Sequence, residues 1–71
     1  MGAIGKRAAE EIRTRCAAKD IFYTTELGWL GLQSQRIYKW EKGVADPNAE
    51  TLARMLDAGY DIKYILLGVR S

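Results

Sequence analysis

The side chains of this sequence that are best placed to do chemistry lie in one stretch, residues 31–43. A hydroxyl, an amide, a phenol and a cation recur there at helical spacing on one predicted face, formed by Ser34, Gln35, Tyr38 and Lys39. The opposite face carries Ile37, Trp40 and Glu41. Hydrogen-bonding groups on an exposed helix can read base edges in the major groove of DNA. A polar helix face is often only solvated, so the surrounding sequence has to decide between the two interpretations.

The residues around this stretch occur in a recognisable order. A glycine turn precedes a short polar helix with a central aliphatic residue, and Trp-Glu-x-Gly follows; these are Gly31, Ile37, Trp40, Glu41 and Gly43. Pro47, residues 50–52 and residues 59–68 continue the pattern. The pattern resembles the lambdoid phage repressor and Cro family, an XRE-type group of regulators, over about residues 4–68. The resemblance implies an all-α fold, a compact bundle of about five short helices that contains a helix-turn-helix.

Length and composition limit the remaining possibilities. The 71 residues form one domain at most, 1–71, and 48% hydrophobic with 28% charged residues is typical of a soluble globular chain. No apolar run approaches the roughly 20 residues that a membrane span needs, and the N-terminal residues lack the apolar core of a signal peptide. With no His and one Cys, the sequence predicts no metal site, no cofactor and no internal disulfide. We expect a cytoplasmic protein that is not an enzyme and has no small-molecule substrate.

The net charge of +2 is small, but its distribution is uneven. Residues 1–19 hold five bases against two acids, residues 20–43 balance three against three, and residues 44–71 hold three bases against four acids. The N-terminal helix and the basic tip at Lys39 and Lys42 therefore form the positive end. Such an arrangement suits a phosphate backbone on one side, although an ordinary solvated surface would look similar.

Helices are expected at residues 3–18, 24–30, 33–42, 49–57 and 61–67. An apolar stripe in the first consists of Ile4, Ala8, Ile12 and Cys16. Thr24, Asn48 and Asp61 are candidate N-caps. Gly59 suits a left-handed helix ending, and Gly68 stops the last helix. The residues expected to point inward from the last two helices are Leu52, Met55, Leu56, Ile62, Ile65 and Leu66.

The predicted second helix departs from the family pattern in two places. The small residue that the family places near its middle falls at Leu27, while Gly28 follows one position later, so we expect Gly28 to permit close packing. Where the family usually has a glutamine that touches phosphate, this chain has residues 23–25. Trp29 covers the core from the edge or belongs to an interface, and we expect the former.

The resemblance also implies roles for individual residues. Base-reading positions fall on Gln33, Ser34, Gln35, Lys39 and Tyr38. Phosphate contacts fall on Arg36, Lys42, Thr24, Thr25 and Arg13. Gly31, Ile37, Trp40 and Glu41 are structural. Similar domains often pair an arginine of the first helix with the glutamate of Trp-Glu-x-Gly, so we expect Arg13 to pair with Glu41. Arg7 is the alternative partner of Glu41. In the other interpretation, Arg13 and Glu41 are two independent surface charges.

One such helix reads about four or five base pairs, so a two-fold dimer on paired half-sites is expected. We predict that Tyr60, Tyr64, Leu67 and Val69 form a weak homodimer surface. The leading hypothesis is a sequence-specific regulator that binds double-stranded DNA, most simply a Cro-like repressor. Two alternatives remain within DNA binding: the N-terminal domain of a longer repressor, or an antitoxin. A third, from another class, is a helical protein-interaction module that no longer binds DNA.

Overall fold

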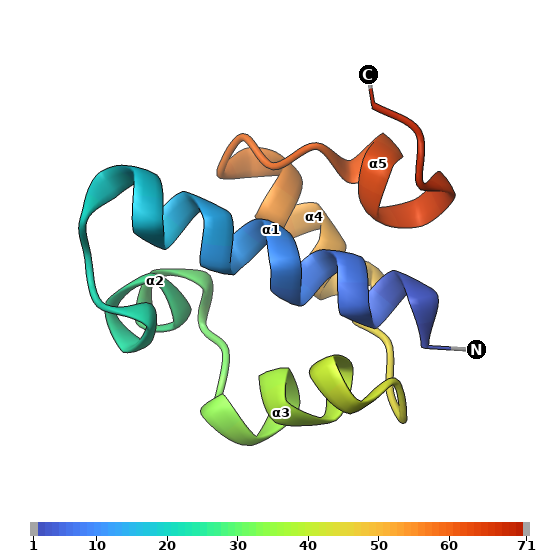
Figure 1. Ribbon diagram of the computed structural model, residues 1–71, viewed down its shortest axis with the longest axis horizontal. Coiled ribbons are helices and arrows are strands. Elements are labelled where there is room, and N and C mark those ends of the chain that lie inside the picture. Colours follow the sequence, from blue (N-terminus) through green and yellow to red (C-terminus); the bar gives the residue numbers. More distant parts are fainter. Residues whose placement is uncertain (1, 71) are drawn as a thin grey trace.

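The computed structural model describes residues 2–70, in which five α-helices are connected by short turns (Figure 1). They are α1 (Ala3–Lys19), α2 (Tyr23–Leu30), α3 (Ser34–Lys42), α4 (Ala49–Asp57) and α5 (Ile62–Leu67). Residues 2–70 contain no β-strand. All five predicted helices are present, and every end lies within one residue of its predicted position. No helix in this range is long and apolar enough to cross a membrane.

Helix α1 runs through the middle of the molecule and packs against α2, α3 and α5 (Figure 1). Its predicted apolar stripe is confirmed, because Ala8, Ile12 and Cys16 are buried and Ile4 is half-buried against the core. Burial raises the pKa of the Cys16 thiol, which agrees with its interpretation as a small core residue.

The close approach of α1 to α3 depends on Gly5. A Cβ atom at this position would lie 2.4 Å from the Ala45 carbonyl oxygen and 3.1 Å from the Trp40 Cα. The Gly5 amide also donates a 2.9 Å hydrogen bond to Asp46 Oδ1. The start of α1 is thereby held against the end of α3 and the loop that follows it.

The helix ends follow the sequence signals with one exception. The side chain of Asn48 accepts a 2.8 Å bond from the Thr51 amide, and Asp61 caps α5 in the same way. Gly59 has the predicted left-handed conformation, with φ 91°. Thr24 is not the cap of α2: the helix already includes Tyr23, and no side chain caps it.

Two expected core residues are exposed. The exposed fraction of Leu56 is 61% and that of Leu66 is 39%, whereas Met55 and Ile65 are fully buried. Helices of nine and six residues have room for only a narrow inward stripe, and the next position along the chain rotates by about 100° out of it. Tyr60, between the two helices, is 5% exposed and contributes to the core.

The expectations for Trp29 and Gly28 were wrong. Leu27 and Leu30 take the inward positions of α2, and Trp29 is 69% exposed. A Cβ at Gly28 would meet no atom within 4 Å, so this glycine does not permit close packing within the chain.

Candidate nucleic-acid interface

Helix α3 has one buried and one exposed side. Ile37 and Trp40, at i and i+3, are almost completely buried and pack into the core beside α1. They fix the rotation of the helix about its axis. The remaining positions from Ser34 to Lys39 therefore face solvent.

A short turn, residues 31–33, sets the position of α3 relative to α2. Gly31 adopts a left-handed conformation with φ 70°, which favours glycine. The Leu32 amide donates a 2.9 Å hydrogen bond to the Leu27 carbonyl, and the Leu32 side chain is buried. Gln33 is extended and precedes the first turn of α3. A glycine-terminated helix, a buried anchor and a second helix thus follow each other within a few residues.

The residues predicted to read bases all lie exposed on or next to α3: Gln33, Ser34, Gln35, Tyr38 and Lys39. Within residues 2–70 these side chains make no hydrogen bond or ion pair, and their polar groups face solvent. The Lys42 ammonium lies 5.2 Å from the centroid of the Tyr38 ring, a cation–π contact at the end of the same helix.

The residues predicted to contact phosphate fall into two groups. Arg36, Lys42, Thr24 and Thr25 are exposed. Arg36 and Lys39 also border a cavity of about 230 Å³ whose other wall is the loop of residues 45–48. Arg13 differs because its guanidinium is already engaged with a carboxylate.

That carboxylate is Glu41, and the predicted pairing is confirmed. Arg13 donates a hydrogen bond to Glu41 Oε2 and forms an ion pair with it. The alternative partner, Arg7, instead donates to the carbonyl oxygens of Ile65 and Leu66 at 2.9 and 3.1 Å. A phosphate contact by Arg13 would therefore have to compete with Glu41.

The Arg13 guanidinium also lies 4.8 Å from the centroid of the Tyr23 ring at the start of α2. Burial, and to a smaller extent the nearby Glu41 charge, raise the pKa of Tyr23 to about 12. The buried Tyr23 hydroxyl has no hydrogen-bond partner among the described residues. Arg13 of α1 therefore links the start of α2 to the end of α3.

Sequence reasoning missed Lys6. A Cβ at Gly43 would lie 3.0 Å from Lys6 Cε and 3.6 Å from its Nζ, so this ammonium stands beside the end of α3. It adds a cation from α1 to Lys42 on α3. The excess of bases in residues 1–19 was the available signal, but it did not identify which base would lie here.

A buried polar pair between α2 and the α4–α5 turn was also missed. Glu26 is 2% exposed, and its Oε2 accepts a 2.5 Å hydrogen bond from the Tyr60 hydroxyl. Burial, followed by this hydrogen bond, raises the pKa of Tyr60. The Arg15 guanidinium lies 3.7 Å from the Tyr60 ring centroid and donates to the Ala58 carbonyl. The position of Glu26 next to Leu27 and one turn before Leu30 could have indicated an inward direction.

The predicted dimer surface is only partly available. Tyr60 is buried, so its assignment to that surface was wrong. The Tyr64 hydroxyl donates to Glu10 at 2.7 Å, and its ring lies 3.8 Å from the Arg70 guanidinium. Leu67 and Val69 are 67% and 56% exposed, as expected.

Among residues 2–70, no cluster of three or more His, Cys, Asp or Glu side chains could hold a metal ion. Comparison of the chain with models of protein families, with curated proteins and with solved structures found no match.

Proposed function

We propose that this protein is a sequence-specific regulator that binds double-stranded DNA. In this proposal α2, the turn 31–33 and α3 act as a helix-turn-helix, with α3 in the major groove. The observation that carries it is the two-sidedness of α3: Ile37 and Trp40 anchor the helix, while the amide, hydroxyl and ammonium groups of its outer face make no hydrogen bond or ion pair within residues 2–70. Such groups pair with base edges, and a rigidly held helix presents them in a fixed register.

Each side chain of the outer face has a role that matches its chemistry. The amide of Gln35 can grip adenine through N6 and N7. The ammonium of Lys39 can reach guanine O6 and N7 or a neighbouring phosphate. Gln33 and Ser34 lie at the leading end of α3, which enters the groove first, and Tyr38 meets a thymine methyl or a backbone oxygen.

Cations beside α3 supply the phosphate contacts. Lys42 and Lys6 stand at or beside the end of α3, and Arg36 borders the loop of residues 45–48. Thr24 and Thr25 offer hydroxyls near the start of α2. These contacts set affinity and register, while the base contacts select the sequence.

A homodimer completes the proposal, because one helix reads too few base pairs to specify a site. Two-fold dimers place their reading helices about one DNA turn apart. Leu67 and Val69 remain the candidates for the contact between copies, since both are exposed at the end of the chain described. A monomer in sedimentation at high micromolar concentration, with and without DNA, would contradict this part alone.

Selection from a pool of random DNA duplexes tests the main proposal. The expected result is enrichment of a two-fold symmetric site, with an affinity that falls steeply as salt rises. No enrichment, together with feeble binding at low salt, would overturn the proposal.

Two variants then distinguish recognition of bases from contacts with phosphate. Gln35→Ala should relax the preference at one base pair by about 1–3 kcal/mol. Lys42→Ala should weaken binding to all DNA sequences alike, and should reduce the slope of log affinity against log salt concentration by about one. Lys63→Ala is the matched control: it removes the same charge from an exposed position of α5, so it should leave both quantities unchanged.

A further inference from the structure

Helices α2 to α5 each end beside a glycine with a positive φ, and a basic side chain from another helix lies next to each of these glycines. The three arginines among these side chains donate hydrogen bonds to carbonyl oxygens at the helix end that they contact. The carbonyl end of a helix carries partial negative charge, so a cation is favourable there. The pairs are Arg54 with Gly31, Lys6 with Gly43, Arg15 with Gly59 and Arg7 with Gly68.

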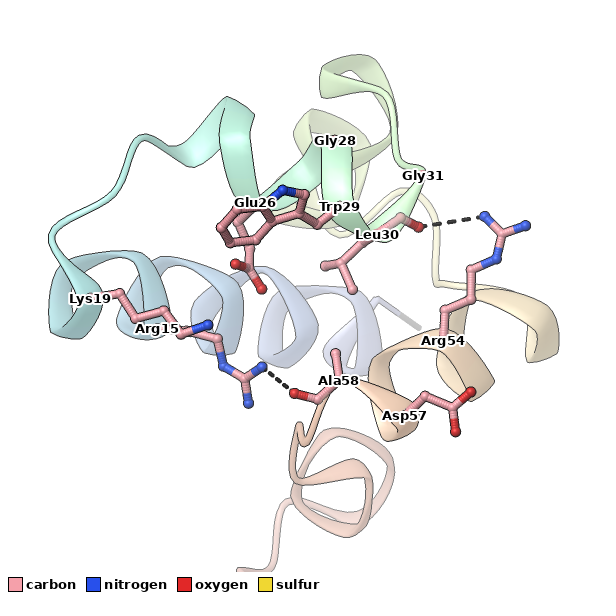
Figure 2. Close-up of a pocket in the computed structure, with 10 residues that line it drawn as sticks. All are labelled: Arg15, Lys19, Glu26, Gly28, Trp29, Leu30, Gly31, Arg54, Asp57 and Ala58. Carbon is pink, nitrogen blue, oxygen red and sulfur yellow. Dashed lines mark hydrogen bonds between the residues drawn. The ribbon is translucent and has the colours of Figure 1, made fainter.

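The pair at the end of α2 differs from the others in its position. Arg54 belongs to α4, whereas the other three cations belong to α1. Gly31 is also the first residue of the turn 31–33, which connects α2 to α3. Figure 2 shows the Arg54 side chain reaching from α4 to the Leu30 carbonyl oxygen, and this hydrogen bond from Nη1 is 3.5 Å long. Arg54 therefore joins α4 to the last residue of α2.

The Arg54 guanidinium is held from two sides. Its Nη2 donates a 2.8 Å hydrogen bond to Glu50 Oε1, one turn earlier on α4. Its Nη1 lies 2.5 Å from the place that a Cβ of residue 31 would take, so the group covers the Gly31 backbone directly. The planar fork of a guanidinium can bond two partners at once in a fixed relation.

The ion pair between Arg54 and Glu50 does not by itself explain this arrangement. The two side chains are 52% and 75% exposed, and ion pairs at such positions contribute little to stability. The effect expected of the guanidinium is therefore local, at the helix end that it touches.

The turn itself depends on few contacts. The Gly31 amide donates to the Gly28 carbonyl at 3.2 Å and the Leu32 amide to the Leu27 carbonyl at 2.9 Å. The buried Leu32 side chain holds the turn from the inside, and Arg54 covers it from the outside. Gln33 and the start of α3 follow directly, so a displaced turn would move the leading end of α3 first.

We propose that Arg54 is a positioning residue: by joining α4 to the turn 31–33, its guanidinium fixes the placement of α3 relative to α2. In this role it acts through the turn rather than by touching DNA. Its effect on base recognition rests on the proposed function, whereas its effect on the turn does not.

Exchange of backbone amide hydrogens for deuterium, followed by NMR on the whole chain, tests the effect on the turn. Arg54→Met removes the guanidinium and keeps an unbranched side chain. The Gly31 and Leu32 amides should then exchange at least about fivefold faster relative to the Ile12 amide in the core of α1. A residue that only adds to overall stability would change the exchange at all three amides alike.

Arg7→Met is the matched control. It removes the same group and the same charge from the end of α5, where Arg7 donates to the carbonyl oxygens of Ile65 and Leu66. The exchange of the Gly31 and Leu32 amides relative to Ile12 should stay as in the parent.

DNA binding tests the second effect. The affinity of each variant is measured for the selected duplex and for duplexes changed at single base pairs. In Arg54→Met the preference at the pairs that meet the leading end of α3 should fall at least about fivefold. Arg7→Met should keep the preference of the parent, although both variants lose one positive charge. If the parent selects no duplex, the proposed function fails, while amide exchange still decides the role of Arg54 at the turn.

Three outcomes would overturn the inference. One is exchange at Gly31 and Leu32 in Arg54→Met that matches the parent. Another is an increase that is equally large at Ile12, which would make Arg54 a general stabilising residue. The third is a faster-exchanging turn in Arg54→Met with the base preference of the parent, which would show that this contact does not set the placement of α3.

Discussion

Adding the same methyl group at two glycines should change stability in opposite directions. Both Gly5 and Gly28 lie inside helices, with backbone conformations that alanine adopts freely. The difference lies in the space beside them. At Gly5 a Cβ would meet the Ala45 carbonyl oxygen at 2.4 Å and the Trp40 Cα at 3.1 Å; at Gly28 it would meet nothing within 4 Å.

The magnitude follows from two opposing effects. Replacing a helical glycine with alanine favours folding by about 0.5–1 kcal/mol. At Gly5 the contacting atoms are backbone, which cannot rotate away, and overpacking of this kind costs about 1–3 kcal/mol. Gly5→Ala should therefore lower the free energy of unfolding by about 0.5–2 kcal/mol, whereas Gly28→Ala should raise it by about 0.5–1 kcal/mol.

Thermal and urea unfolding followed by far-UV circular dichroism measure both effects. In a domain of this size, 1 kcal/mol corresponds to a shift in Tm of about 4–8 °C. Gly5→Ala should also weaken DNA binding, because α1 can no longer approach α3 closely. If Gly5→Ala is as stable as the parent, or if the two variants shift in the same direction, the account of α1–α3 packing is wrong.

Three further predictions concern polar groups. Tyr60→Phe removes the hydroxyl that donates to the buried Glu26 carboxylate, and should lower the free energy of unfolding by about 1.5–3 kcal/mol in urea titrations. Asn48→Ala removes the cap that accepts the Thr51 amide and should lower it by about 0.5–2 kcal/mol, while Asn48→Asp should retain most of the stability. The pKa of Tyr23 is raised from 10.0 to about 12 in the folded chain, so its contribution to stability is present below pH 10 and is lost as pH rises towards 12. Tyr23→Phe should therefore reduce the alkaline loss of stability in unfolding curves measured between pH 9 and pH 12.

Each of these has an outcome that would contradict it. An unchanged midpoint for Tyr60→Phe would mean that Glu26 finds another donor. If Asn48→Ala and Asn48→Asp lower the free energy of unfolding equally, the loss does not come from the missing helix cap. An identical alkaline profile in the parent and Tyr23→Phe would show that other groups govern that pH range.

The sequence predicted the helices because its signals are local. The spacing of Ala8, Ile12 and Cys16 defines an inward stripe, and Asn48 and Asp61 each bond to an amide three residues later. The Arg13–Glu41 ion pair was also predictable, but only through a family resemblance, because nothing local relates two residues on different helices.

The incorrect predictions concern which side chains point into the core and where two segments approach closely, and both depend on tertiary packing. Trp29 and Leu30 are neighbours on a short apolar helix, and only the arrangement of α1 and α4 decides that Leu30 enters the core. Gly28 was expected to permit close packing, but that role belongs to Gly5, where two segments meet. The hydrogen bond between Glu26 and Tyr60 joins residues 34 positions apart and has no sequence signature.

The hydrogen bonds of Arg7 have a consequence for how the chain folds during synthesis. They join α1, the first helix made, to the carbonyl oxygens of Ile65 and Leu66 in the last, and α1 also packs against α3. Until α5 has left the ribosome, the side of α1 that packs against it has no partner to cover it. We therefore expect the domain to fold as one unit after α5 emerges rather than helix by helix, with this uncovered side of α1 as the surface that chaperones would meet first.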